Sequence, residues 1–284
     1  MLSLEDVKSY RAETYRTRRD LRIATRAEAV DHANDRGFIM FWPIKDIEMP
    51  SLWAAVAGDR PVPNNHDDPA HKTWGWKDSL LGKRQWYYAK VLRRKATIIS
   101  LDVAPYFYAL SENFGSPEDD YLYQYRDGTM TAEAKSIYEA LLFNGPLNAL
   151  VLRREVSMTD NKSSYRFNKG LEELQMDFKV MPIGVAEAGA WNYAFIYECV
   201  HRYHPEFLEQ AREIGIMEAR RKLVMLYLRS VGVAQFGDVS KAFWWPRRET
   251  ERTLSALTEA GELVPDVEIQ GQKGAWYALP ELVG

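Results

Sequence analysis

The fold is decided by residues 218–277, which read EARRKLVMLYLRSVGVAQFGDVSKAFWWPRRETERTLSALTEAGELVPDVEIQGQKGAWY. The apolar spacing predicts a helix over 218–230 that ends near Gly232, a short helix over 235–242 and a third helix over 246–260. Two strand-like runs follow, LVPDVEIQ and AWYALP, and GQKG joins them as a turn. This stretch therefore predicts three helices followed by a β-hairpin.

The same order of signals occurs once before in the chain. Helices are predicted over 131–143, 147–156 and 161–178, and the strands FKVMPIGV and AWNYAFIY follow them. We expect Asn161 or Ser163 to cap the third of these helices, because their side chains can accept hydrogen bonds from exposed backbone amides. The chain therefore contains two copies of one arrangement.

Both third helices carry an apolar stripe at the same spacing. The stripe consists of Phe167, Leu171 and Leu174 in the first copy and of Thr250, Leu254 and Leu257 in the second. Helix, helix, helix and hairpin is the winged-helix unit, which mostly binds nucleic acid. We therefore predict a mainly α fold with small β-hairpins (α+β), with a winged helix over 129–204 and a C-terminal winged helix over 214–284.

The N-terminal region, 1–128, is predicted to be helical with a divergent winged-helix-like part. A helix over 26–37 ends at Gly37, which can adopt the left-handed conformation of a helix cap. Three prolines and many turn formers predict a long surface loop over 54–76, and ATIISLDV looks like a strand. Glycine, proline and acidic residues over 111–130 mark the expected end of this region.

Composition limits the location and the partners of the protein. The 284 residues are 46% hydrophobic, which is enough for a sizeable core in two or three domains. Because no run approaches the roughly 18 apolar residues of a membrane span, and the first residues mix both charge signs, we expect a cytoplasmic protein without a membrane partner. Cys199 is the only cysteine and stands among apolar residues, so we expect a buried structural thiol.

The net charge of −3 means that a polyanion would have to be bound by a local basic face. Residues 77–95 form one such stretch, with three aromatic residues among the basic ones. The basic residues expected to contact nucleic acid are Lys83, Arg84, Arg93, Arg94, Arg166, Lys169, Arg247, Arg248 and Arg252. The candidates for stacking on a base are Trp42, Trp74, Trp76 and Trp86. The alternative is that the charges form a solvated surface and the tryptophans build core.

Both copies, and especially residues 217–279, resemble the AlkZ-like (YcaQ-type) DNA glycosylases, bacterial proteins that remove alkylated or crosslinked bases from DNA. The resemblance implies tandem winged-helix modules around a concave basic channel, and a role in DNA repair. Its implied partner is DNA, in the double-stranded form, and we favour a monomer. Members of this family carry a glutamine in an apolar run, then a spacer, then a glutamine or aspartate that is often followed by proline.

In this chain the corresponding run is GFIMFWPI, residues 37–44, which places Met40 and Trp42 at the two catalytic positions of the family. A thioether is a weak hydrogen-bond acceptor and an indole only donates, so neither can activate a water molecule. The leading hypothesis is therefore a DNA-binding protein with lost or rewired base excision.

Two other functions stay open from the sequence. Asp46 or Glu48, just downstream, could supply the missing carboxylate of an active glycosylase or related hydrolase of modified nucleobases. Alternatively, the winged helices could bind protein in a transcription-associated complex. No P-loop, GxGxxG, GxSxG, HExxH or CxxC spacing is present, so we expect no cofactor and no metal.

Overall fold

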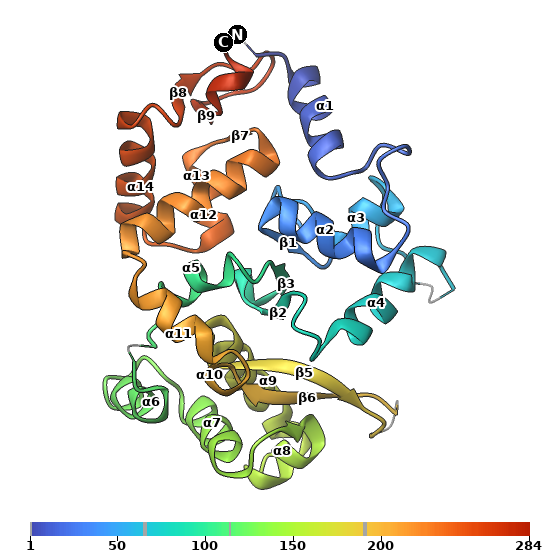
Figure 1. Ribbon diagram of the computed structural model, residues 1–284, viewed down its shortest axis with the longest axis vertical. Coiled ribbons are helices and arrows are strands. Elements are labelled where there is room, and N and C mark those ends of the chain that lie inside the picture. The colour runs from blue at the N-terminus through green and yellow to red at the C-terminus, as the bar shows by residue number, and fades with distance from the viewer. Residues whose placement is uncertain (1, 65–66, 114, 190–191) are drawn as a thin grey trace.

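The computed structural model describes residues 2–64, 67–113, 115–189 and 192–284. The chain is mixed α/β and mainly helical, with three small antiparallel sheets. One order of elements occurs three times: helix, strand, two helices and two strands (Figure 1). In each sheet the third strand lies between the first and the second. We call these repeats unit 1 (26–99), unit 2 (132–199) and unit 3 (216–278).

Unit 1 is the repeat that the sequence revealed least clearly. Its elements are α2 (Arg26–Arg36), β1 (Phe38–Met40), α3 (Leu52–Ala57), α4 (Lys72–Leu80), β2 (Tyr87–Lys90) and β3 (Ala96–Ile99). The cap at Gly37 is confirmed, with φ at +79°. The prediction of a surface loop over 54–76 is wrong at both ends, because α3 and α4 extend into it and α3 buries Trp53 and Ala55 completely.

Unit 2 follows the predicted order of elements closely. Its elements are α7 (Ala132–Asn144), β4 (Leu147–Asn148), α8 (Ala149–Glu155), α9 (Asn161–Met176), β5 (Val180–Ala186) and β6 (Ala194–Cys199). The predicted cap of α9 is wrong: Asp160 caps it, and its carboxylate accepts hydrogen bonds from the amides of Lys162 and Ser163 at 2.8 and 2.9 Å. A carboxylate at this position also interacts favourably with the helix dipole. The thiol of Cys199 is buried, as predicted.

Unit 3 repeats the same pattern at the C-terminal end. Its elements are α12 (Ile216–Val231), β7 (Val233–Ala234), α13 (Phe236–Phe243), α14 (Arg247–Glu259), β8 (Val264–Val267) and β9 (Trp276–Ala278). The apolar stripe predicted on α14 is buried at Thr250, Leu254 and Leu257. Helix α12 packs against α14 and against α1 (Leu4–Thr14), α2 and α5 (Ala104–Tyr108), which lie outside its own unit.

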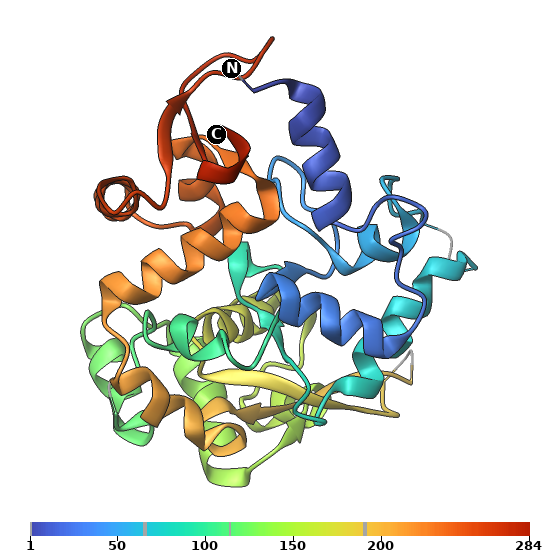
Figure 2. The ribbon, with the colours of Figure 1, turned by 45° about the horizontal axis from the view of Figure 1, so that its top comes forward.

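The remaining elements connect and brace the units. They are α1 (Leu4–Thr14), η1 (Pro69–His71), η2 (Leu92–Arg94), α5 (Ala104–Tyr108), α6 (Pro117–Arg126), α10 (Val200–Tyr203), α11 (Pro205–Arg212) and η3 (Pro280–Leu282). Helix α6 lies within residues 111–130, where the sequence predicts only the end of the N-terminal region and no helix. Helix α1 lies beside unit 3 (Figure 2), where Arg11 donates hydrogen bonds to the carbonyls of Val231 and Val233 at 2.9 and 3.1 Å.

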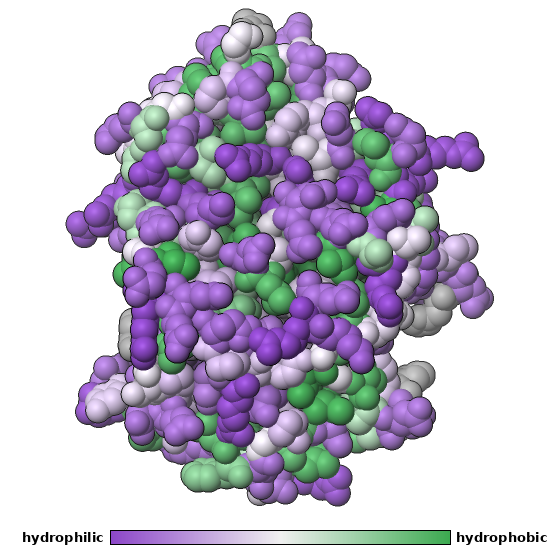
Figure 3. Space-filling model, viewed as in Figure 1, coloured by the Kyte–Doolittle hydropathy of each residue, from purple (hydrophilic) through white to green (hydrophobic). Residues whose placement is uncertain are grey.

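One apolar core joins all three units. It contains Phe38 and Tyr87 of unit 1, Phe178 and Met181 near the end of α9, and Leu223 of α12. The rings of Tyr87 and Phe178 stack with their centroids 4.5 Å apart. The face seen in Figure 3 is mostly hydrophilic, with separate apolar areas. Within the described ranges, no helix has both the length and the apolar content to cross a membrane.

Candidate nucleic-acid interface

Units 1 and 3 meet where the tip of the β2–β3 hairpin reaches the end of α13. The hairpin tip is η2, and its Arg93 and Arg94 place their guanidinium groups over the indole ring of Trp244, 4.6 and 5.6 Å from the ring centroid. Trp244 lies between α13 and α14 and is 53% exposed. A large aromatic side chain that is about half exposed and has two cations beside its ring is a candidate contact for a nucleotide base.

The backbone at this junction is held in left-handed conformations. Ten non-glycine residues of the described chain have positive φ, and five of them lie at the junction: Asp46, Arg93, Arg94, Phe178 and Trp244. Such a conformation costs about 1–2 kcal/mol per residue. Strained residues gather at functional sites because the surrounding structure fixes side chains there in particular directions.

A hollow of about 700 Å³ lies on one side of the junction. It is lined by Pro43, Ile44, Lys45, Asp46, Ile47, Arg93, Lys95 and Lys241, and we call it the basic hollow. These residues come from three separate segments: the β1–α3 connection, the β2–β3 hairpin and α13. Four basic side chains face one carboxylate, so the hollow suits the phosphates of a polyanion.

A second cavity, of about 340 Å³, lies on the other side of Arg93, and we call it the acidic pocket. Its aromatic lining consists of Phe107, Phe178, Phe243, Trp244 and Trp245. The charged residues of its lining are Glu112, Glu173, Asp177 and Arg93. Among the residues that the structure describes, no group of three His, Cys, Asp or Glu side chains is placed to hold a metal ion. The cavity falls within the usual range of small-molecule sites, about 300–1,000 Å³.

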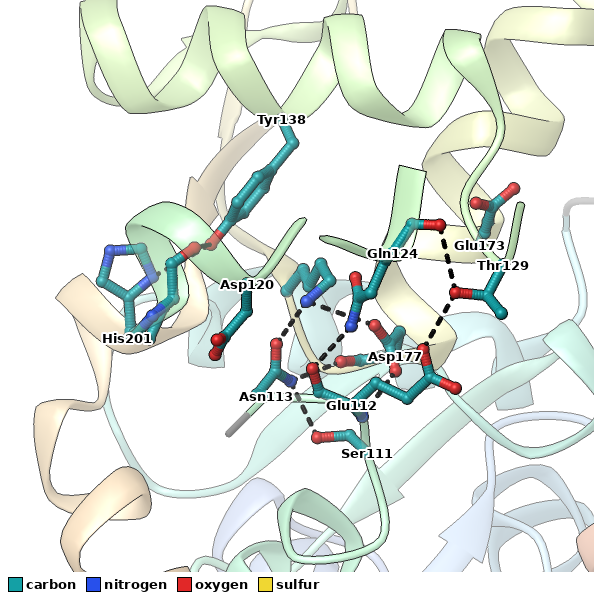
Figure 4. Close-up of polar contacts among 12 residues, drawn as sticks. Ser111, Glu112, Asn113, Asp120, Gln124, Thr129, Tyr138, Glu173, Asp177 and His201 are labelled. Atoms are coloured by element: carbon teal, nitrogen blue, oxygen red, sulfur yellow. Dashed lines mark hydrogen bonds and ion pairs between the residues drawn. The ribbon is translucent and has the colours of Figure 1, made fainter. Parts of the chain in front are cut away.

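A buried polar network lies beside the acidic pocket and includes Asp177 of its lining (Figure 4). The fully buried ammonium of Lys179 donates to Asn113 Oδ1 at 2.5 Å and lies 3.3 Å from Asp177 Oδ2. Asn113 donates in turn to Ser111 Oγ and to the carbonyl of Asp177, both at 2.7 Å. Burial raises the pKa of Asp177, although the Lys179 ammonium opposes the shift. The network fixes the loop at 111–113 against the end of α9.

The four residues proposed from the sequence for the reaction centre do not gather in one place. Met40 is 1% exposed and belongs to the apolar core that joins the three units, whereas Trp42 is half-buried in a separate aromatic cluster. Asp46 lines the basic hollow. Glu48 accepts a hydrogen bond from the Tyr15 hydroxyl at 2.9 Å and pairs with Arg11 at 3.0 Å.

The aromatic cluster around Trp42 encloses a lysine. Lys77 Nζ lies 4.5–5.8 Å from the ring centroids of Phe41, Trp74, Tyr88, Tyr193 and Phe195. This ammonium pairs with Asp78 at 2.8 Å and donates to the Tyr193 hydroxyl at 3.0 Å. Burial lowers the pKa of Lys77. Because the rings come from units 1 and 2, the caged cation joins those two units.

The tryptophans proposed for base stacking differ in exposure. Trp74 is 42% exposed and Trp86 is 3% exposed, in the core of unit 1. Trp76 is half-buried, and the Lys72 ammonium lies 4.9 Å from its ring centroid. Trp244 is not among the tryptophans proposed from the sequence, although it stands in WWP directly before a basic helix. Of these two adjacent tryptophans, Trp245 stacks on Phe243 in the core and Trp244 stays exposed.

The predicted basic residues divide into three groups. Arg93 and Arg94 lie at the junction. Four others are paired with acids of their own chain: Arg84 with Glu206, Arg166 with Glu133, Lys169 with Glu172 and Arg247 with Glu251. Lys83, Arg248 and Arg252 are exposed and line neither the basic hollow nor the acidic pocket. The residues of the basic hollow that sequence reasoning missed are Lys45 and Lys241; Lys95 ends the basic stretch 77–95 but was not singled out within it.

Comparisons with known proteins give one family and one fold. A family model described as AlkZ related matches residues 23–243. The structure is similar to the Streptomyces sahachiroi DNA glycosylase AlkZ, with a TM-score of 0.58 and 13% sequence identity, over 99% of this chain and 71% of that chain. None of the curated proteins compared with the chain matches it. At this level of identity the structural likeness is evidence for the fold alone.

Proposed function

Because this chain belongs to the AlkZ-related family, we propose that it binds double-stranded DNA and acts in DNA repair. We further propose that the three units are winged-helix modules. Their shared topology supports this assignment, since each has three helices, a short strand after the first helix and a terminal hairpin. The corresponding domains are an N-terminal region over 1–128, a winged helix over 129–204 and another over 214–284.

The observation that carries the proposal is the basic hollow. Lys45, Arg93, Lys95 and Lys241 come from three distant segments of the sequence and line one hollow, in a chain whose net charge is −3. Like charges repel, so bringing four cations together without four acids is unfavourable unless an anion binds there. Phosphates of the DNA backbone are suitable anions, because lysine and arginine provide most of the contacts that position a protein on DNA.

The experiment that tests DNA binding is a measurement of affinity for a duplex oligonucleotide across a range of salt concentrations. Each phosphate contact contributes about 0.9 to the slope of log K against log salt. If the four cations of the hollow bind phosphates, we expect a slope of about −3 to −4. A duplex affinity that is weak at low salt, with a slope near zero, would contradict the proposal and favour a protein partner.

We propose that base excision by the usual pair of family residues is lost, since the resemblance of the run GFIMFWPI places Met40 and Trp42 at those positions and neither side chain can activate water. A second candidate function, an active hydrolase of modified nucleobases, is favoured by Asp46. Its carboxylate is the only one that lines the basic hollow in the described part of the chain, and it sits in a tight turn between Ile44 and Ile47 with φ at +61°.

An abasic-site cleavage assay on oligonucleotides with alkylated bases tests this second function. If the Asp46 carboxylate is the general base that activates water, Asp46→Asn should reduce the rate of nucleobase release by at least about 10²-fold, because a general base typically contributes about 10²–10⁴-fold. Asparagine also tolerates the left-handed conformation, so this variant keeps the turn. Glu48→Gln serves as the control, because Glu48 is held by Tyr15 and Arg11. Equal loss in both variants, or activity unchanged in Asp46→Asn, would contradict a catalytic role for Asp46.

A further inference from the structure

The two cavities at the junction have opposite charge. The basic hollow is lined by four cations and one acid, whereas the acidic pocket is lined by three acids and one cation. Arg93 lines both, so they are neighbours. A nucleotide has the matching polarity, with an anionic phosphate at one end and a planar ring at the other.

The walls of the acidic pocket suit a planar ring. Trp245 and Phe243 stack with their centroids 4.4 Å apart and 16° between their planes, so these rings are fixed. Trp244 is exposed beside them and is held by the two arginines of η2. Stacking of a base on an aromatic side chain contributes about 1–3 kcal/mol.

The polar groups of the acidic pocket are mostly hydrogen-bond acceptors. Gln124 is only 7% exposed, and its side-chain oxygen has no hydrogen-bond partner among the residues that the structure describes, although its amide donates to the Glu112 carbonyl at 2.5 Å. The carboxylate of Glu112 accepts a hydrogen bond from Thr129 at 3.1 Å, and that of Glu173 accepts from Thr131. Each carboxylate has about four acceptor sites, so both keep capacity for further donors.

A buried acceptor without a donor costs free energy, and a ligand that supplies N–H groups removes this cost. We propose that the acidic pocket binds a planar heteroaromatic ring with an exocyclic amino group, such as adenine or cytosine, from a strand whose phosphates lie in the basic hollow. The proposal rests on the DNA-binding function for the source of that nucleotide. It places the ring away from Met40, which is buried in the core.

Free nucleosides test the pocket separately from the hollow, because they carry no phosphate. Adenosine has an exocyclic amino group with two N–H donors beside an unprotonated N1, whereas inosine has a carbonyl acceptor there beside a single N1–H donor. Cytidine and uridine differ in the same way at the exocyclic position and N3. We expect adenosine and cytidine to bind about tenfold more tightly than inosine and uridine, as one good hydrogen bond gives about this ratio. Tryptophan fluorescence titration or ligand-observed NMR would measure the ratio.

Two variants assign the effect to residues. Gln124→Leu should reduce the preference for adenosine over inosine to less than about threefold, because the unpaired acceptor is gone. Trp244→Ala, at an exposed position that does not support the core, should weaken every nucleoside about tenfold through loss of stacking. Phe143→Ala is the control, since Phe143 is also an exposed aromatic side chain, at 84%, but does not line the pocket, and it should leave all affinities unchanged.

The outcomes separate the two proposals. Equal affinity for adenosine and inosine, or no binding of either at about 10 mM, a concentration well above typical weak dissociation constants, would overturn the pocket proposal. In that case a salt-dependent affinity for duplex DNA would still support the proposed function. If nucleosides bind with the expected preference but duplex DNA does not bind at low salt, the pocket proposal stands for free nucleotides and the DNA-binding function fails.

Discussion

Replacing Lys95 and Lys241 with glutamate should weaken the binding of duplex DNA by about 10²–10³-fold at 0.1 M salt, on the order expected for two lost phosphate contacts and added repulsion. The two lysines come from the β2–β3 hairpin and from α13, and both line the basic hollow. Both positions belong to the surface of the hollow, so the fold should not depend on either side chain. The slope of log K against log salt should become shallower by about 2.

The control for this experiment changes net charge by the same amount elsewhere. Lys8 and Arg19 are exposed in the N-terminal segment and line neither cavity at the junction. The variant with Lys8→Glu and Arg19→Glu should lose less than about threefold in affinity, through the long-range field alone. Similar losses in the two double variants would show that DNA responds to net charge and that the hollow is not the binding site.

A third variant compares the hollow with the helices that the sequence favours. Arg166, Lys169, Arg247 and Arg248 lie on α9 and α14, and the first three pair with acids of their own chain. If all four are changed to glutamate and DNA affinity at low salt is unaltered, these helices do not contact the backbone. If the loss of DNA affinity is instead larger than that of the double variant Lys95→Glu, Lys241→Glu, the main contact surface for DNA lies on the helices and not in the basic hollow.

The repeats in units 2 and 3 could be predicted because their signals are local. The stripe at Phe167, Leu171 and Leu174 has the spacing of one helix face, and its burial follows from that spacing alone. Glycines mark the ends of α7 and α12, where Gly145 and Gly232 adopt positive φ. Such patterns depend on neighbours within one or two helical turns, so they can be read from the chain.

Unit 1 and the junction could not be predicted because their signals depend on distant contacts. The short helices α3 and α4 lie in a stretch rich in turn formers, and they are held by tertiary packing: Trp53 is fully buried, and Lys77 is enclosed by rings from two units. Lys45 and Lys241 lie far in the sequence from the basic stretch that ends at Lys95, and only the fold brings the three lysines to one hollow. The end of α13, where Trp244 has a left-handed backbone, likewise becomes a site only when η2 packs on it.

The stability of the fold should fall by about 3 kcal/mol between pH 7 and pH 4.5 through one buried histidine, His32 of α2. His32 is 1% exposed, and its Nε2 finds no hydrogen-bond partner within the described ranges of the chain. Burial, with smaller contributions from Arg16 and Arg36, lowers the pKa of His32 to about 3. In the unfolded chain a histidine titrates near pH 6.5, so between about pH 6.5 and 3 the unfolded state binds one more proton than the folded state. The free energy of unfolding therefore decreases as pH falls through this window, by about 1.4 kcal/mol per pH unit.

Urea unfolding of the wild type and of His32→Leu at pH 7 and pH 4.5 measures this contribution as a difference. Leucine fills similar space and cannot take up a proton, so the variant should lose about 3 kcal/mol less than the wild type over the same interval. Carboxylates and the other histidines affect both proteins alike and cancel in the comparison. Val30→Ala in the same helix is the control, because it lowers stability without removing a titrating group and should keep the full dependence on pH. If His32→Leu and the wild type lose the same amount, the imidazole of the folded protein is already protonated at pH 4.5, and α2 must open to solvent at the position where the structure buries it.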